Sequence, residues 1–470
     1  MVSAYLADAL RDPTGELQEL YTNTTSDDFP AEVVKHFTRV FEKDEAFRQI
    51  PVLNLRNPPR SHSDRALVRF RAMVQDPSTS AEMYLARSKS GKLCGWGLEA
   101  IEYADHEDVD FENLRECTVL WAIGVPGESE WAGEELDSAE ATSPSAEVPS
   151  PPRPHKSPKQ ADAHLGVQIK LYDGDASTRL KSTDVATFVG ILSHEPLTLE
   201  SDEPVTVPTL HALFVAPDER SSVARPYLSS NSSQTREELV RWLADEALGG
   251  DTEAAEWVLL STISRVTPFE PESIDEDLHA GALQLPKGTV ILVTEQDIQE
   301  GKLLDRGVMN VRALQEVMVS QTLSYSFPFS RFSFPTDLTC LVTTDGSRSA
   351  FFKTDLTVSL NVPDTPASSS KLYKPKESMQ MPSTEQLATF RDYVVGARCG
   401  KITVSESTSE YIQQDFVRDR QQNKTITSDD LIRRMTVAKL YALSCHASEL
   451  TIDIWERAKA LDERRRARLV

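Results

Sequence analysis

The spacing of apolar positions divides the chain into a helical start, a β-rich middle and a mainly helical end. In residues 1–60, one apolar stripe recurs at helical spacing, formed by Val33, Val34, Phe37, Val40 and Phe41. Such a stripe is typical of an amphipathic helix that packs on a core. We therefore predict an N-terminal helical region over residues 1–60.

A block of period-two alternation follows. Leu67–Asp76 alternates apolar and polar residues, which predicts a half-buried strand, and Met83–Ala86 is predicted to be its hairpin partner. Cys117–Val125 is more continuously apolar and predicts a buried strand. Residues 61–127 thus contain strands of one sheet.

Strands resume at Gly166–Tyr172 and Val185–Leu192, the second with a glycine, Gly190, where a strand of a small barrel would bend. The two β blocks, 61–127 and 165–216, predict one five-stranded OB-like barrel that is interrupted midway. Residues 128–164 are rich in Glu, Ser and Pro, a composition that favours a disordered insert.

An α/β pattern occupies residues 217–362. We predict a helix over Glu237–Ala247 and a second helix that Thr252 caps, with Ala255, Leu259 and Thr262 on one face. Further predicted elements are a buried strand at Thr289–Thr294, a helix at Asn310–Thr322 and a strand at Leu338–Thr343. Residues 363–381 are rich in Pro and Ser and predict a linker, and residues 382–470 are predicted to be helical.

Charge and composition narrow the function. The 470 residues carry a formal net charge of -23, which argues against electrostatic binding along a phosphate backbone. Arg115 is the single Lys or Arg between Leu93 and Pro152, so a protein-binding or structural barrel is favoured. A single-stranded nucleic-acid module that uses Arg69 and Arg71 is the alternative.

Other sequence signals limit location and chemistry. No run of about 18 apolar residues predicts a membrane span, and the acidic stretch Met1–Leu20 is unlike a signal peptide. The five cysteines and nine histidines are scattered, so no local zinc site is expected. We expect a cytosolic or nuclear protein without metal or cofactor.

Catalytic motifs are missing from the sequence. There is no Gly-x-x-x-x-Gly-Lys-[Ser/Thr] phosphate loop, no Gly-x-Ser-x-Gly elbow and no His-Glu-x-x-His. Pro286–Thr289 contains Lys and Gly but precedes a strand rather than a helix. Glu295, at a strand end, is the one position that suits a water-positioning acid of an ATPase, and the favoured interpretation is a polar residue that closes the strand. We predict a protein that is not an enzyme, with a divergent ATPase as the alternative.

Several segments resemble those of the mini-chromosome maintenance (MCM) complex-binding protein family, in the same order along nearly the whole chain. They are Phe70–Asp76, Val125–Trp131, Gly190–Pro196, Leu283–Pro286, Gly307–Asn310, Ile426–Leu431, Trp455–Lys459 and Arg464–Leu469.

The resemblance implies a fold: α+β and multidomain, an OB-like barrel followed by a degenerate AAA+-like, MCM-like core and a C-terminal helical lid. Val290–Glu295 resembles a Walker B strand, but Thr294 stands in place of the metal-binding Asp. Gln321–Tyr325 resembles a helix-to-hairpin passage, and Asp429 stands in place of a phosphate-contacting Arg. Only about two dozen residues separate Ile263 from Thr289, too few for the phosphate-loop strand, its helix and a further strand.

The resemblance also implies a function. We expect a nuclear, non-catalytic protein that binds MCM helicase subunits as a neighbour would and regulates their assembly or their unloading from chromatin during DNA replication. A role in sister chromatid cohesion during mitosis is implied as well. Chromatin association would be indirect, and neither a membrane nor a small-molecule substrate is expected.

Candidate partner contacts lie in the predicted lid. Leu431, Met435, Ala438 and Ala442 form one stripe, and Ile454, Ala458 and Leu461, next to Trp455, form another. The alternative is that the two stripes pack on each other. The arginines Arg464, Arg465, Arg466 and Arg468 form a basic end that predicts a nuclear-import patch, an acid-binding tail or a solvated helix end.

Overall fold

The structure, a computed structural model, divides into two compact units. It describes residues 2–24, 26, 28–88, 91–98, 111–128, 165–174, 179–197, 205–216, 232–265, 281–296, 301–346, 348–361 and 374–469. The first unit comprises Met1–Ser222, Glu270–Lys287 and Leu323–Pro335, and the second comprises the rest. The predicted disordered insert lies outside the described residues except for Glu128, as does the linker except for its end, residues 374–381. The prediction that the molecule mixes helices with strands is confirmed.

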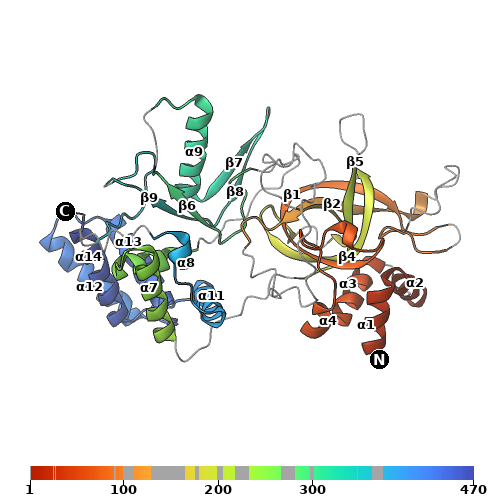
Figure 1. Cartoon of the computed structure of the whole chain (residues 1–470), viewed down its shortest axis with the longest axis horizontal. Coiled ribbons are helices and arrows are strands. Elements are labelled where there is room, and N and C mark those ends of the chain that lie inside the picture. Colours follow the sequence, from red (N-terminus) through yellow and green to blue (C-terminus); the bar gives the residue numbers. More distant parts are fainter. Residues whose placement is uncertain are drawn as a thin grey trace. The chain divides into compact units, whose positions relative to one another are not determined.

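The first unit begins with the helices α1 (Val2–Arg11), α2 (Pro13–Asn23), α3 (Phe29–Val40) and α4 (Asp44–Arg48). Asp12 and Asp28 cap α2 and α3 by accepting bonds from backbone N–H groups of the first turn. The predicted stripe is confirmed: Val33, Phe37 and Phe41 are fully buried. These helices share one apolar core with part of the barrel and lie against it (Figure 1).

Five strands close into a barrel in the order β1-β2-β3-β5-β4, with β4 pairing back to β1. They are β1 (Leu67–Leu85), β2 (Leu114–Gly124), β3 (Gly166–Leu171), β4 (Val185–Leu197) and β5 (Val205–Ala216). All neighbours are antiparallel except β3 and β5, which are parallel. Closure leaves the barrel without an edge strand, and its interior is filled by fully buried side chains such as Phe188 and Val167.

The hairpin predicted between Leu67–Asp76 and Met83–Ala86 is wrong. Leu67–Asp76 and Met83–Leu85 belong to the single strand β1, and both halves of this strand pair with β2. Register shifts between Val74 and Asp76 and between Asp76 and Ser80 let the strand bend and continue. A bulge also tolerates Pro77, which cannot donate to the ladder.

The bend predicted at Gly190 is confirmed. The β4–β5 register shifts between Val189 and Gly190. A Cβ at Gly190 would lie 2.2 Å from the backbone oxygen of His211. Only a residue without a side chain permits β4 and β5 to approach this closely.

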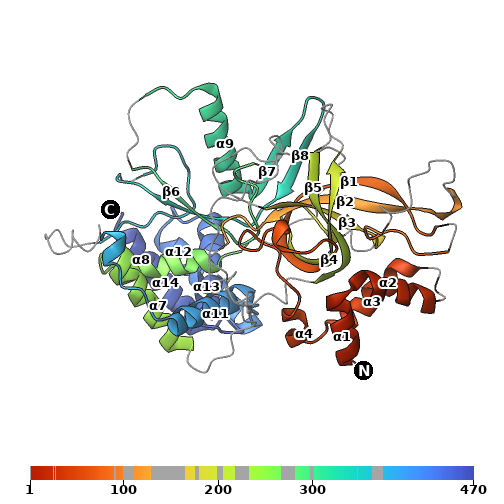
Figure 2. The ribbon, with the colours of Figure 1, turned by 45° about the vertical axis from the view of Figure 1, so that its right-hand side comes forward.

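The second unit holds the helices α7 (Ser232–Ala247), α8 (Thr252–Ile263), α11 (Thr384–Cys399), α12 (Glu406–Gln422), α13 (Ser428–Ser444) and α14 (Ile452–Ala467). They gather in one cluster around a common apolar core (Figure 2). The mainly helical end is thus confirmed. The cap of α8 is Asp251 and not Thr252 as predicted, since the Asp251 carboxylate accepts a bond from Ala254 N at 3.1 Å.

A small α/β layer completes the second unit. It has two parallel strands, β6 (Val290–Thr294) and β9 (Thr339–Thr343), and the helix α9 (Asp305–Ser320). The predicted helix Asn310–Thr322 in fact begins five residues earlier and ends at Ser320, because the next residue, Gln321, has a φ of 50° and terminates the helix. Thr322 already belongs to β7 (Thr322–Ser326), which pairs with β8 (Arg331–Pro335), and residues Leu323–Pro335 of this pair belong to the first unit.

The prediction that Thr289–Thr294 is a buried strand is wrong. Burial alternates along β6, and its exposed positions include Val290 and Leu292, the latter 68% exposed. The sheet has two strands only, so β9 covers one edge of β6 and no described strand covers the other. Among the described residues no helix is long and apolar enough to cross a membrane.

Candidate partner interface

The C-terminal helices are fixed by local capping. Thr427 and Asp430 form a capping box at the start of α13, in which the Asp430 carboxylate accepts from Thr427 N at 2.9 Å. The Thr451 hydroxyl accepts from Ile454 N at the start of α14. Each of these helices therefore begins where its sequence supplies an acceptor for free N–H groups.

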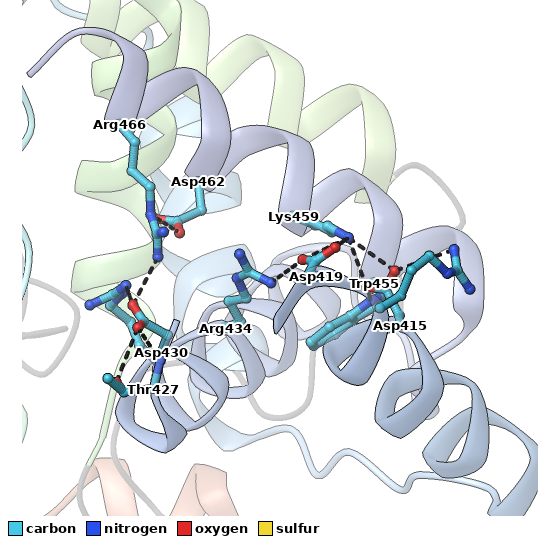
Figure 3. A network of polar contacts seen from close by, with 11 residues as sticks. Asp415, Asp419, Thr427, Asp430, Arg434, Trp455, Lys459, Asp462 and Arg466 are labelled. Carbon is cyan, nitrogen blue, oxygen red and sulfur yellow. Dashed lines mark hydrogen bonds and ion pairs between the residues drawn. The ribbon is translucent and has the colours of Figure 1, made fainter. Parts of the chain in front are cut away.

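A buried ionic network joins α12, α13 and α14 (Figure 3). Trp455 Nε1 donates to Asp415 at 3.1 Å, and Lys459 Nζ donates to Asp415 at 2.9 Å and to Asp419 at 3.1 Å. Arg434 donates to Asp419 at 2.6 Å. Because each buried charge has a partner of opposite sign, the network holds three helices in one register.

Electrostatics within the network follow from these bonds. Burial disfavours the charged form of Lys459, but its hydrogen bonds to Asp415 and Asp419 outweigh burial and raise its pKa. Burial would raise the pKa of Asp419, yet the bonds from Arg434 and Lys459 lower it. Both shifts keep the ion pairs charged over a wide pH range, as expected for a structural element.

Asp430 anchors a second group of contacts. Burial opposes its charge, but bonds from Thr427 and Arg433 lower the pKa of Asp430 to about 2. Arg466 on α14 also donates to Asp430, at 3.2 Å, and its Nε lies 2.9 Å from Asp462 (Figure 3). Asp430 therefore ties the beginning of α13 to the end of α14.

The candidate contact residues divide by burial. Ala438, Trp455 and Ala458 are buried in the helical core, whereas Leu431 and Met435 on α13 are half-buried. This placement agrees with the alternative interpretation, in which the two stripes pack on each other. Next to Leu431, Ile432 is 64% exposed, so one side of α13 keeps an apolar side chain in solvent.

The arginines of the basic end are engaged within the second unit. Arg464 pairs with Glu253 and keeps a half-exposed side chain, and Arg468 pairs with Asp251 at 2.7 Å. Arg465 is buried, donates to Asp462 at 2.7 Å and to Thr357 O at 2.9 Å, and lies over the Trp257 ring.

The interpretation of a solvated helix end is therefore wrong for Arg465. Its partner Thr357, and the partners of Arg464 and Arg468 on or next to α8, are more than 100 residues away in sequence. No local pattern could have identified them. The one usable signal was the surplus of acidic residues available to four clustered arginines.

Each position compared with an ATPase either has a local partner or lies exposed. The Glu295 carboxylate accepts from Ser349 Oγ at 2.5 Å and from Ala350 N at 2.9 Å, so it closes a loop. Asp429 lies exposed on α13, and Lys287 pairs with Asp184 at 2.7 Å. Within residues 281–296 and 301–346, no glycine-rich turn opens a helix.

The two barrel arginines of the nucleic-acid alternative also have partners within the chain. Arg69 is buried, donates to Ile50 O at 3.0 Å and lies over the Phe47 ring. Arg71 pairs with Glu128. These two side chains contact neighbouring residues of the first unit, and they do not form an exposed basic groove.

A cavity of about 530 Å³ lies in the first unit between α3 and β5. Its lining is mostly apolar, with Val34 and Phe214 among the residues, and its lysine, Lys287, is the one paired with Asp184. Across the part of the chain that the structure describes, no group of three His, Cys, Asp or Glu side chains could hold a metal ion.

Comparison with known proteins gives one consistent result. A family model described as mini-chromosome maintenance replisome factor matches residues 37–163 and 268–469. The chain is 23% identical to the mini-chromosome maintenance complex-binding protein of Salmo salar over 620 positions, covering 98% of this chain and 97% of the relative. The proteins of that name from Arabidopsis thaliana and Homo sapiens are each 22% identical and cover 98% of this chain, and 99% and 98% of their own lengths.

These alignments contain long gaps. The alignment with the salmon protein runs over 620 positions whereas this chain has 470 residues, so at least 150 positions have no counterpart here. The order of the matched segments is nevertheless kept from the barrel to the last helix. Since the family model matches more than half of the chain, the chain belongs to the mini-chromosome maintenance replisome factor family.

Proposed function

We propose that this protein binds MCM subunits without catalysing a reaction and thereby regulates their assembly or their unloading from chromatin during DNA replication. The observation that carries the proposal is similarity over nearly the whole chain to proteins named for binding the MCM complex. By extension, the protein acts in the nucleus, contributes to sister chromatid cohesion and reaches chromatin indirectly.

The geometry supports a role in binding. Glu295, the acid that an ATPase would need, is held by Ser349 and Ala350. The buried charges of the C-terminal helices are paired with each other. A fold that has lost its site chemistry remains usable as a surface.

We further interpret the barrel as OB-like and the second unit as a degenerate AAA+-like core with a helical lid. The strand order β1-β2-β3-β5-β4 and the bend at Gly190 support the first interpretation. The parallel pair β6–β9 with α9, followed by the helices α11–α14, supports the second.

Within the lid-like helices, we propose that the partner contacts the side of α13 that carries Leu431, Ile432 and Met435. Ile432 is largely exposed, and its two neighbours are accessible in part. Arg464 and Arg466 at the end of α14 would contribute to the rim, because both retain exposed side-chain surface. Ala438, Trp455 and Ala458 would support this face from the buried helical core.

The decisive experiment is affinity purification from nuclear extract with the full-length chain as bait. MCM subunits are the expected partners, and their absence would contradict the proposal. The variant Ile432→Lys should reduce their recovery about tenfold, the loss expected when a charge enters an apolar contact. Leu292→Lys, which alters an exposed leucine on β6, is the matched control and should leave recovery unchanged.

Absence of catalysis has a separate test. Equilibrium binding of labelled ATP with Mg²⁺ should give no affinity in the micromolar range, because the sequence contains no Gly-x-x-x-x-Gly-Lys-[Ser/Thr] loop whose amides could surround the phosphates. Micromolar binding with appreciable turnover would instead support a divergent ATPase. The readout does not depend on MCM subunits, so the two parts of the proposal fail independently.

A further inference from the structure

The strand β6 presents an open edge. At the two ends of its pairing with β9, Thr339 N donates a hydrogen bond to Thr289 O at 3.0 Å and Glu295 N donates to Thr343 O at 3.0 Å. Peptide groups of alternate residues in a strand point to opposite sides. Val290, Leu292 and Thr294 therefore direct their N–H and C=O groups to the outer edge, where no strand of the described chain pairs with them.

This edge is also apolar. None of its five residues is buried, although the run Val-Ile-Leu-Val-Thr has the composition of a core strand. Proteins usually protect an open edge with Lys, Pro or a bulge, and β6 has none of these. A parallel pair is normally part of a larger sheet covered on both faces, so β6–β9 is an incomplete sheet among the described residues.

We propose that β6 pairs in antiparallel fashion with β6 of a second copy of this chain, joining two two-stranded sheets into one of four strands. The sequence of the strand favours this occupant, because it is self-complementary about Leu292, its central and most exposed residue. In that register Leu292 faces Leu292 of the copy, Val290 faces Thr294, and Ile291 faces Val293.

The register satisfies the backbone as well. Val290, Leu292 and Thr294 are the residues whose peptide groups face outward, and each meets a residue of the copy with the same orientation. About six new backbone hydrogen bonds result. No charged residue occurs in β6, so no like charges are brought together across the twofold axis. The inference concerns self-association and does not depend on the proposed binding of MCM subunits.

The first test is the mass of the full-length protein by sedimentation equilibrium over roughly 1 to 100 µM, the range in which a small interface associates. A dimer is expected, and Leu292→Lys should weaken it at least tenfold without changing the circular dichroism spectrum. Ile432→Lys, which places a lysine at an equally exposed site on α13, should dimerise as the unmodified chain does. A chain that stays monomeric, or a dimer that Leu292→Lys leaves intact, would overturn the proposal.

The second test fixes the register by disulfide formation, with Cys399, which is exposed, first replaced by Ser. In Leu292→Cys the two introduced Cα atoms would lie about 5.5 Å apart, within disulfide range. In Thr294→Cys they would be separated by four residues along the pair, about 13 Å, which is too far. Rapid cross-linking at position 292 and none at 294 is expected, and the reverse pattern would refute this register.

Discussion

The strands of the barrel and the strand β6 have similar apolar sequences, but the barrel residues are buried and the β6 residues are exposed. Phe188 and Val189 of β4 are fully buried, whereas Val290 and Leu292 of β6 are exposed. Both runs are apolar and rich in β-branched residues. The difference is that β4 has a neighbour on each side within a closed barrel, and β6 has one neighbour in a sheet of two.

This contrast shows that an apolar run determines a strand more reliably than it determines burial. A run of β-branched side chains indicates a strand because these side chains fit the pleated surface of a sheet, and the run itself can be read from the sequence. Burial requires other segments to lie on both faces, which is a property of the whole sheet. For β6 the described residues supply one such segment on its edge, the strand β9, and the other edge has no described strand.

The largest expected effect concerns the barrel core. Phe188→Ala should lower the free energy of unfolding by about 3 to 5 kcal/mol, because it leaves a cavity among packed side chains. Phe329→Ala removes the same atoms from a fully exposed residue after β7. It should change the free energy of unfolding by less than about 0.5 kcal/mol. Urea unfolding measures both variants. Equal losses would contradict the assignment of Phe188 to the barrel interior.

A second effect tests how the barrel closes. Gly190→Ala forces a Cβ into contact with the backbone of His211, so β4 and β5 must separate, at a cost of about 1 to 3 kcal/mol. Gly174→Ala is the control, since a Cβ there meets nothing within 4 Å. Urea midpoints should differ clearly between the two variants. If Gly190→Ala were as stable as the control, the close approach of the two strands would be refuted.

Sequence reasoning succeeded where the cause was local. The stripe that includes Val33 and Phe37 follows from helical spacing, and the bend at Gly190 follows from a single glycine in a β-branched run. It failed where pairing decided the result: β1 continues through Pro77 because β2 follows it on both sides of the bulge. The engagement of Arg465 with Thr357 and Trp257 depends on segments far apart in sequence, and no spacing rule reports it.

A smaller effect is the pH dependence of the barrel. His211 is fully buried, with Nε2 2.8 Å from Glu195 and 2.9 Å from Ser193, and Nδ1 2.8 Å from the Tyr172 hydroxyl. Burial lowers its pKa below 6.5, against the influence of Glu195. The unfolded chain therefore binds a proton first on acidification, and stability should fall as the pH drops below about 6.5.

Glu195 extends this dependence to lower pH. Burial opposes its charge, but His211 and Lys170 lower its pKa from 4.5 to about 2. Its contribution is present above pH 4.5 and is lost as the pH falls from there towards 2. Urea unfolding between about pH 7.5 and pH 5.5 isolates the histidine, and His211→Gln should flatten the profile in that interval. An equally steep profile in the variant would show that another group titrates there.

The smallest expected effect tests the exposed strand itself. In dilute solution, Leu292→Ala should change the free energy of unfolding by less than about 0.5 kcal/mol, because the side chain is already in water. If a second copy covers β6, the unmodified chain gains stability with concentration by mass action, and the variant gains less. The melting temperatures of the two proteins should therefore coincide at low concentration and separate as concentration rises. A large loss in the variant at every concentration would mean that β6 is buried within its own chain, and the contrast between barrel and layer would no longer hold.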